Sequence, residues 1–290
     1  MIIQLDETRI AHRFNKAANT YDPVAVLQQR VGESLLERLQ GIRCQPQTIL
    51  DLGCGTGYCE IFLKKFYPAA KIIGLDKSNG MLAQAQAKEK EYQLTDIHWV
   101  NGCAENLPFS DHSFELVYSN LMLHWSNDFT KSLKEIRRVL KPEGLLLFSM
   151  VGPDTLQELR YCWRTIDNQP HVHLFVDMHD LGDNLLQTPF VDPVMDVEYF
   201  TLLYSEALDL MNELKKLGVQ NIARDRQRGL TSKGTLKKLI QAYECFRSPE
   251  GKLPATWEII YGHAWAAEKK PKNQNDFSDI KIPLSSIIRG

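Results

Sequence analysis

Five short apolar runs recur along the first half of the chain, separated by stretches whose apolar residues have helical spacing. The runs cover residues 48–52, 71–76, 97–100, 114–118 and 145–150. Unbroken runs of this length are typical of parallel strands, because helices cover both faces of a parallel sheet. The alternation predicts a Rossmann-like α/β fold, a doubly wound parallel sheet with right-handed crossovers.

Two helices are predicted before the first strand, over about residues 8–40. Asp22-Pro23 has the chemistry of a helix start, with Asp as N-cap and Pro in the first turn. The residues that follow have a stripe of apolar positions at spacings of three and four. Ligands of open α/β folds bind at the carboxyl ends of the strands, which these helices are placed to cover. Tyr21 would then lie beside a bound ligand, although a structural aromatic residue is an equally good interpretation.

The alternation changes beyond residue 152. Helices are predicted over 154–166, 177–186, 205–217 and 231–246, and strands over 194–204 and 256–266. Residues of about 205–250 are therefore a helical insertion between the last two strands, and we expect this insertion to act as a lid over the site. The domain is expected to span residues 1–268, with a polar, loosely attached tail over 269–290.

Composition limits the class of protein but does not indicate which reaction the protein catalyses. The 290 residues carry a formal net charge of −2, which gives no overall attraction to nucleic acid or to an anionic membrane. The six cysteines include no C-x-x-C pair, and the sequence shows neither a signal-peptide core nor an apolar run as long as a membrane span. His171 and His173 lack partners at metal-ligand spacing, so no metal is predicted. We expect a cytoplasmic monomer or weak homodimer.

The glycines that follow the first strand are the strongest chemical signal. Gly53, Gly55 and Gly57 turn the chain sharply before a helix that begins at Tyr58, which leaves N–H groups exposed to a nucleotide. A dinucleotide fingerprint would need G-x-G-x-x-G, and here the third glycine comes one residue early. Asp76 ends the second apolar run, nineteen residues after Gly57. A carboxylate at that place can accept both ribose hydroxyls of an adenosine.

The segment from Asp51 to Gly57, with Asp76, resembles the S-adenosylmethionine site of class I methyltransferases. The resemblance implies S-adenosyl-L-methionine as cofactor, S-adenosyl-L-homocysteine as its product, and no metal. It assigns cofactor binding to Asp51, Gly53, Gly55, Gly57, Asp76, Lys77, Met81, Cys103, Ala104, Glu105 and Asn120. Many relatives have Asp at position 103, which accepts a hydrogen bond from adenine. A thiol is a weaker acceptor, so backbone groups of Ala104 and Glu105 are expected to recognise adenine instead.

Two further features are candidates for the substrate side. His124-Trp125 follows the fourth predicted strand, where this fold places its substrate, and core packing is an equally good interpretation. Residues 224–238 hold six basic residues and one acid, a local charge of +5 in the predicted lid. Most charge runs are solvated surface, but arginine in particular suits an anionic substrate or an acidic partner protein.

Five stretches resemble the malonyl-acyl carrier protein O-methyltransferases of biotin synthesis. They are residues 13–21, 25–28, 119–125, 228–231 and 253–265, and the resemblance covers roughly residues 9–266. It implies methylation of the free carboxylate of malonyl-acyl carrier protein, or of malonyl-CoA, to an ester that primes pimelate synthesis. It assigns substrate binding to Tyr21, His124, Trp125 and Arg228, with Tyr21 and His124 as positioning candidates and Arg228 gripping the carboxylate. It assigns steering of the acidic carrier protein to Arg224, Arg226, Lys233, Lys237 and Lys238.

A carboxylate acceptor fits a sequence with no obvious catalytic base, because its pKa lies far below neutral. Catalysis then rests on holding an oxygen in line with the sulfonium methyl, which can contribute roughly 7–11 kcal/mol. One alternative is a methyltransferase for another small carboxylate or a quinone-type carbon acid, and the carbon acid would need Tyr21 or His124 as base. The other is a catalytically inactive cofactor-binding regulatory partner, against which the intact glycine turn and Asp76 argue.

Overall fold

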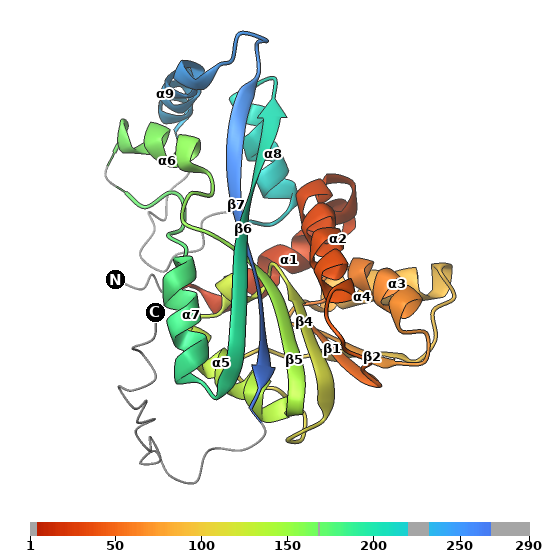
Figure 1. Cartoon of the computed structure of the whole chain (residues 1–290). Helices are drawn as coiled ribbons and strands as arrows, with labels where there is room; N and C mark the ends of the chain where they lie inside the picture. The colour runs from red at the N-terminus through yellow and green to blue at the C-terminus, as the bar shows by residue number, and fades with distance from the viewer. Residues whose placement is uncertain (1–4, 168, 220–231, 268–290) are drawn as a thin grey trace, which may run out of the picture.

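The computed structural model describes residues 5–167, 169–219 and 232–267, which form one seven-stranded sheet with flanking helices (Figure 1). The strand order is β3-β2-β1-β4-β5-β7-β6. The first five strands are parallel, β7 is antiparallel to β5, and β6 is antiparallel to β7. The strands are β1 (Thr48–Leu52), β2 (Lys71–Asp76), β3 (Ile97–Asn101), β4 (Phe114–Asn120), β5 (Leu140–Val151), β6 (Phe190–Tyr204) and β7 (Leu253–Ala266). The predicted Rossmann-like α/β fold is confirmed.

Nine α-helices lie within the described residues. They are α1 (Glu7–Tyr21), α2 (Val26–Gln40), α3 (Tyr58–Phe66), α4 (Asn79–Glu91), α5 (Phe129–Val139), α6 (Gln157–Arg164), α7 (Met178–Gln187), α8 (Ala207–Lys216) and α9 (Lys233–Tyr243). Short 3-10 turns occur at Asp22–Val24, Leu123–Trp125 and Glu244–Phe246.

The two faces of the sheet are covered by different helices, as the unbroken apolar strands predicted. On one face Ile49 of β1 belongs to the same buried cluster as Leu35 of α2 and Leu63 of α3. On the other face Leu50 clusters with Ile136 of α5 and with residues of α7. Successive residues of a strand point to opposite faces, so each strand needs apolar residues at every position. Figure 1 shows α5 and α7 on one side of the sheet and α2, α3 and α4 on the other.

The prediction that Asp22 caps the second helix is wrong. α1 continues to Tyr21, a 3-10 turn follows, and α2 begins at Val26 without a side-chain cap. The Asp22 carboxylate instead accepts a hydrogen bond from the Thr56 hydroxyl at 2.6 Å and pairs with Lys88 Nζ at 2.9 Å. These contacts join the two amino-terminal helices to the glycine turn and to α4.

The last three strands begin earlier than predicted. β5 already pairs with β4 at Leu140, β6 begins at Phe190 and β7 at Leu253. The segments left out of the predicted β6 and β7 contain Pro193 and Pro254, and proline is uncommon inside strands. The two strands pair from Phe190 to Tyr204 with one irregularity. Their ribbon rises beyond the carboxyl ends of the parallel strands and carries α6, α8 and α9 alongside it (Figure 1).

The helices α8 and α9 lie between β6 and β7 in sequence, within the insertion predicted over about 205–250. A lid function for this insertion stays a prediction, as do the domain boundaries at 1–268. Residues 220–231 and the tail over 269–290 lie outside the described residues.

The amino-terminal helix α1 is held against α4 at the carboxyl edge of the sheet. Asn15 Oδ1 accepts hydrogen bonds from the Ser78 hydroxyl at 2.8 Å and from the Gly80 N–H at 2.6 Å. Lys77 Nζ reaches Glu7 at 2.7 Å, and a further bond joins the side chains of Gln84 and Asn19. Polar contacts thus fix α1 over the edge where ligands of this fold bind.

Two carboxyl groups are buried behind the glycine turn, Asp51 at 2 % exposure and Glu60 at 0 %. Burial and the neighbouring charge of Glu60 raise the pKa of Asp51 well above its usual value, and burial raises the pKa of Glu60 to about 7. A buried carboxyl group of raised pKa holds its proton at a pH where an exposed one has lost it.

Glu60→Gln is expected to flatten the pH dependence of stability. The folded pKa of Glu60 is about 7 against a usual value of 4.5, so its contribution is full below about pH 4.5 and is lost as the pH rises through 7. The size of that contribution is on the order of 2–3 kcal/mol. The melting temperature of the unmodified protein should therefore fall more between pH 5 and pH 8 than that of Glu60→Gln. Glu37→Gln, at an exposed position of α2, serves as control. Equal slopes for all three proteins would contradict the assignment.

Candidate active site

The glycine turn forms the floor of a large cavity at the carboxyl ends of β1, β2 and β4. Gly53, Gly55 and Gly57 all have positive φ, at 81°, 56° and 76°. The N–H of Gly53 donates to the Leu75 carbonyl at 2.7 Å, which anchors the turn to the end of β2. A Cβ on Gly55 would meet no protein atom within 4 Å, so the space before it is open to a ligand. A Cβ on Gly57 would lie 3.0 Å from that of Ala85, so this glycine serves close packing.

Asp76 lies at the end of β2 and is tied to the turn. Its carboxylate accepts the Ser78 N–H at 2.7 Å and the Gly55 N–H at 3.0 Å. Burial raises the pKa of Asp76, and these backbone N–H groups oppose that shift. A carboxylate has about four lone-pair sites, so Asp76 can accept further hydrogen bonds from a ribose.

Several residues assigned to the cofactor line this cavity: Gly53, Gly55, Asp76, Lys77, Met81, Cys103, Ala104, Glu105 and Asn120. Besides Asp76 and Lys77, the side chains of Glu105 and Asn120 also have structural partners. The Glu105 carboxylate accepts the Ser126 hydroxyl at 2.8 Å and the Asn127 N–H at 3.2 Å. The Asn120 amide donates to the Gln28 carbonyl at 2.9 Å and accepts from Ser149 at 2.8 Å.

Asp51 and Gly57 do not line this cavity. Asp51 lines a smaller adjoining pocket of about 60 Å³, which it shares with Tyr21, Gly53 and Gly55. Gly57 lies behind the turn as the residue before α3. Direct contact of either residue with the cofactor stays a prediction.

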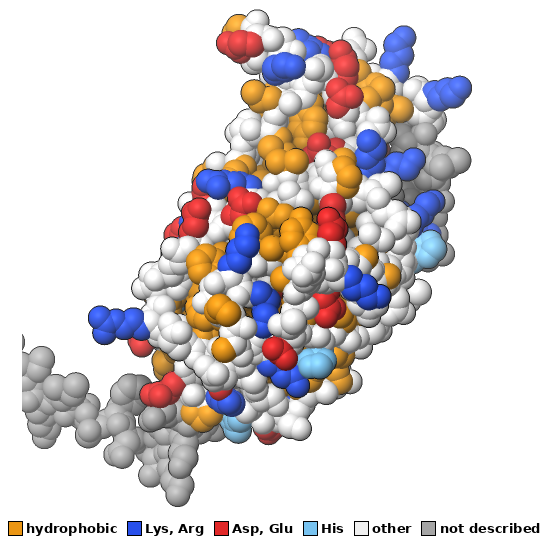
Figure 2. All heavy atoms as spheres, turned by 90° about the vertical axis from the view of Figure 1, so that its right-hand side faces the viewer, with side chains coloured by type: hydrophobic (Ala, Val, Ile, Leu, Met, Phe, Trp, Pro, Cys, Tyr) orange, Lys and Arg blue, Asp and Glu red, His pale blue; other side chains and the backbone are white. Residues whose placement is uncertain are grey.

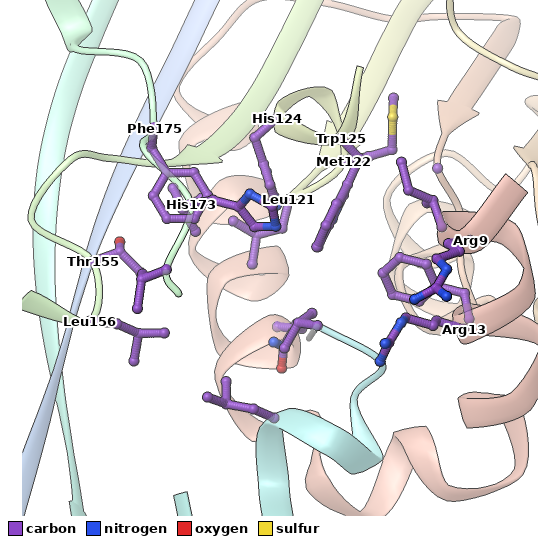
Figure 3. A pocket seen from close by; sticks show the side chains of 18 of the residues that line it. Arg9, Arg13, Leu121, Met122, His124, Trp125, Thr155, Leu156, His173 and Phe175 are labelled. Carbon is purple, nitrogen blue, oxygen red and sulfur yellow. The ribbon is translucent and has the colours of Figure 1, made fainter. Parts of the chain in front are cut away.

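The cavity continues past the cofactor residues to the predicted substrate residues Tyr21, His124 and Trp125, and its volume is about 1080 Å³. The rings of His124 and Phe175 meet edge to face with centroids 5.9 Å apart. Figure 3 shows His124, His173 and Phe175 grouped on one wall, with Arg9 and Arg13 on the opposite side. The structure thus brings a wall of rings and two cations to one cavity.

Neither Tyr21 nor His124 has the pKa of a base that works near neutral pH. Burial, with a contribution from Asp76, raises the pKa of Tyr21 and keeps its phenol protonated. Burial, with a contribution from His173, lowers the pKa of His124 to about 3, so its imidazole is neutral. The Nδ1 atom of His124 is buried and has no hydrogen-bond partner among the described residues.

Sequence reasoning missed Arg9 and Arg13, which line the cavity from α1. Arg9 Nε lies 3.6 Å from Asp6. The signal was their spacing of four residues, which places two cations on one face of a helix. His173 and Phe175 were also missed, because they lie in a segment between α6 and α7 without a regular pattern.

The basic residues are only partly described. Arg224, Arg226 and Arg228 lie outside the described residues, Lys233 and Lys237 are exposed on α9, and Lys238 is exposed and lines the cavity. Figure 2 shows the face of the molecule that carries α3 and α4, where acidic and basic side chains are interspersed. That face offers no field of one sign to an acidic partner, in contrast to α9.

His171 has a structural role in place of metal binding. Its ring stacks on Trp163 with centroids 3.5 Å apart, and Nε2 lies 2.8 Å from Asp167. Within residues 5–167, 169–219 and 232–267, no group of three or more His, Cys, Asp or Glu side chains is placed to hold a metal ion. None of the described helices is both long and apolar enough to cross a membrane.

The sheet order and a ligand cavity at the carboxyl edge, floored by a glycine turn, define an S-adenosylmethionine-dependent methyltransferase of class I. The methyltransferase domain family matches residues 50–148. YcgJ of Bacillus subtilis has a similar fold, with a TM-score of 0.57 at 19 % identity over 82 % of this chain and 99 % of that one. Phosphoethanolamine N-methyltransferase 2 of Haemonchus contortus, solved with S-adenosylhomocysteine, aligns with a TM-score of 0.51 at 18 % identity over 81 % of this chain and 52 % of that one.

Curated relatives give the family. The malonyl-[acyl-carrier protein] O-methyltransferase of Methylovorus sp. is 44 % identical over 96 % of this chain and 95 % of its own length. The protein of the same name from Halorhodospira halophila is 40 % identical over 98 % and 96 %. The chain belongs to the malonyl-[acyl-carrier protein] O-methyltransferase family.

Asp76→Ala is expected to weaken binding of S-adenosylmethionine about 10- to 150-fold, because hydrogen bonds to a charged group contribute about 1.5–3 kcal/mol. Isothermal calorimetry measures the affinity, and the melting temperature shows whether the variant folds. Asp76→Asn retains a hydrogen-bond acceptor, so its affinity for S-adenosylmethionine should lie between those of the unmodified protein and Asp76→Ala. An affinity unchanged in Asp76→Ala would contradict a role of this carboxylate at the ribose.

Proposed function

We propose that this enzyme transfers the methyl group of S-adenosylmethionine to the free carboxylate of malonyl-acyl carrier protein or malonyl-CoA. The product is a methyl ester that would prime pimelate synthesis for biotin. The proposal is supported by relatives of that name at about 40 % identity over nearly the full chain.

The proposal is carried by the placement of Tyr21 and His124 in the cavity, where burial shifts the pKa of each away from that of a base. A carbon acid would need a base, and a phenol of raised pKa and an imidazole whose pKa is lowered to about 3 both serve poorly near neutral pH. A carboxylate needs none, since it is already ionised. The arrangement therefore favours O-methylation of a carboxylate over methylation of a quinone-type carbon.

A neutral His124 is well suited to orient the acceptor. As the Nδ1–H tautomer it would donate its unpaired hydrogen bond to the malonyl group without adding positive charge. A neutral donor of this kind would fix the direction of the attacking oxygen. In-line positioning of this kind would be the main contribution to the acceleration of methyl transfer.

Other residues complete the proposed binding. Gln28 lines the cavity, and its buried Oε1 has no partner among the described residues, so it would accept a hydrogen bond from the cofactor ammonium. Arg9 and Arg13 would attract the malonyl carboxylate into the cavity. Arg228 stays the proposed grip on that carboxylate. The proposed oligomeric state is a monomer or weak homodimer.

The test is an assay with methyl-labelled S-adenosylmethionine and the malonyl, succinyl and acetyl thioesters of acyl carrier protein. Label is expected in the malonyl thioester as an ester cleaved by mild base, and none in the acetyl thioester, which has no carboxylate. The rate should be nearly constant from about pH 6 to pH 8, because the carboxylate stays ionised and His124 stays neutral. Label in the acetyl thioester, or a rate that rises tenfold per pH unit, would contradict the proposal.

The steering role of α9 is tested by Lys237→Ala with Lys238→Ala. Charges that only steer act through the association rate, so kcat/KM for the carrier-bound substrate should fall about tenfold at low salt. The loss should fade near physiological salt, where the Debye length is about 8 Å. Lys215→Ala with Lys216→Ala removes the same charge from α8 and is the control. An equal loss on malonyl-pantetheine, at every salt concentration, would contradict steering.

A further inference from the structure

The cavity contains an apolar chamber beyond the cofactor residues, lined by Leu159 and Trp163 of α6, Met211 and Leu214 of α8, and Trp257 of β7. We infer that this chamber holds the pantetheine arm of the thioester substrate and that the Trp257 indole donates a hydrogen bond to an amide carbonyl of that arm. The inference rests on the proposed function, because only a carrier-bound or coenzyme A-bound acceptor has such an arm.

The cavity is larger than one small ligand requires. Its volume of about 1080 Å³ lies above the roughly 300–1,000 Å³ typical of a single small-molecule site. The cofactor residues lie at the ends of the parallel strands, whereas the residues that line the chamber come from α6, α8 and β7. The ribbon of β6 and β7 rises beyond the ends of the parallel strands (Figure 1). One continuous space therefore offers room for the cofactor and a long second ligand.

The chamber is built before any ligand enters. Glu158 of α6 accepts hydrogen bonds from Thr256 of β7, at 3.0 Å from its N–H and 2.5 Å from its hydroxyl. The next residue on each element, Leu159 and Trp257, lines the chamber. Both are 6 % exposed, so their positions are fixed by packing as well as by this bond. A preformed wall suits a flexible chain, because the protein itself loses little entropy on binding.

Trp257 supplies the polar feature that selects the occupant. Its Nε1 is enclosed and has no hydrogen-bond partner among the described residues. An indole nitrogen only donates, so a ligand must bring an acceptor to satisfy it. A plain acyl chain has no acceptor to offer along its length. The pantetheine arm has amide carbonyls spaced by methylene groups, which match one donor among apolar side chains.

Ser232, the N-cap residue of α9, and Thr235 and Lys238 of α9 also line the cavity, and Lys238 is exposed. The arm carries a phosphate and then the carrier protein or the nucleotide at the end remote from the thioester. That anionic end would emerge beside the basic helix α9, and the thioester would lie toward His124.

Trp257→Phe keeps the ring and removes the donor. KM for malonyl-pantetheine should rise about 3- to 10-fold, the range for one lost hydrogen bond, with kcat unchanged. KM for the S-ethyl thioester of malonate, which has no amides, should not change, and neither should the affinity for S-adenosylmethionine. The same rise is expected with malonyl-acyl carrier protein and malonyl-CoA, which share the arm. Trp265→Phe, on the same strand but away from the cavity, is the control.

A second variant tests the inference if the substitution Trp257→Phe lowers the melting temperature too far for kinetic measurements. Met211→Trp would fill the chamber from α8, where the present side chain is flexible and only partly buried. It should abolish turnover of malonyl-pantetheine while the S-ethyl thioester is still methylated. The inference would be overturned if either folded variant changed KM and kcat for malonyl-pantetheine by no more than it changed them for the S-ethyl thioester. The proposed function would remain intact. Absence of label on both thioesters with the unmodified enzyme would overturn the proposed function and the inference together.

Discussion

The Asp76 carboxylate is the interaction on which the rest of the site depends. It binds the N–H of Gly55 in the glycine turn and the N–H of Ser78 at the start of α4. Ser78 in turn donates to Asn15 of α1. One partly buried acid thus joins the two strand ends that form the cofactor floor to the helix that covers it. Because its partners are mostly backbone groups, the geometry depends little on which side chains surround it.

The charges of the residues near the proposed acceptor depend on how far those residues are buried. A cavity that excludes water strengthens attraction between a carboxylate and a sulfonium, and it also penalises any charge without a partner. Burial lowers the pKa of His124 and raises the pKa of Tyr21, so both side chains are uncharged. Methylation of a carboxylate requires only desolvation and alignment, so a site without a working base is an advantage here. A second anion near the nucleophile would raise the cost of burying it.

Sequence predicted the parts of the molecule that local patterns encode. The strands β1 to β4, the turn at Gly53 to Gly57 and the acid at Asp76 depend on neighbours in the chain. The role of Asp22 could not be predicted, because Thr56 and Lys88 approach it only after folding. The partners of Glu105 were hidden for the same reason. Pro193 and Pro254 concealed the lengths of β6 and β7, since only tertiary pairing shows that a strand tolerates them.

The comparisons separate what the fold encodes from what this family adds. Solved structures at 18–19 % identity have a similar fold, and a fold by itself does not determine the acceptor. Acceptor choice must then come from elements placed beyond the parallel strands. In this chain α6, α8 and α9 lie beside the long β6–β7 ribbon, and residues of all three helices line the cavity. The ribbon therefore positions helices that line the cavity beyond the residues assigned to the cofactor.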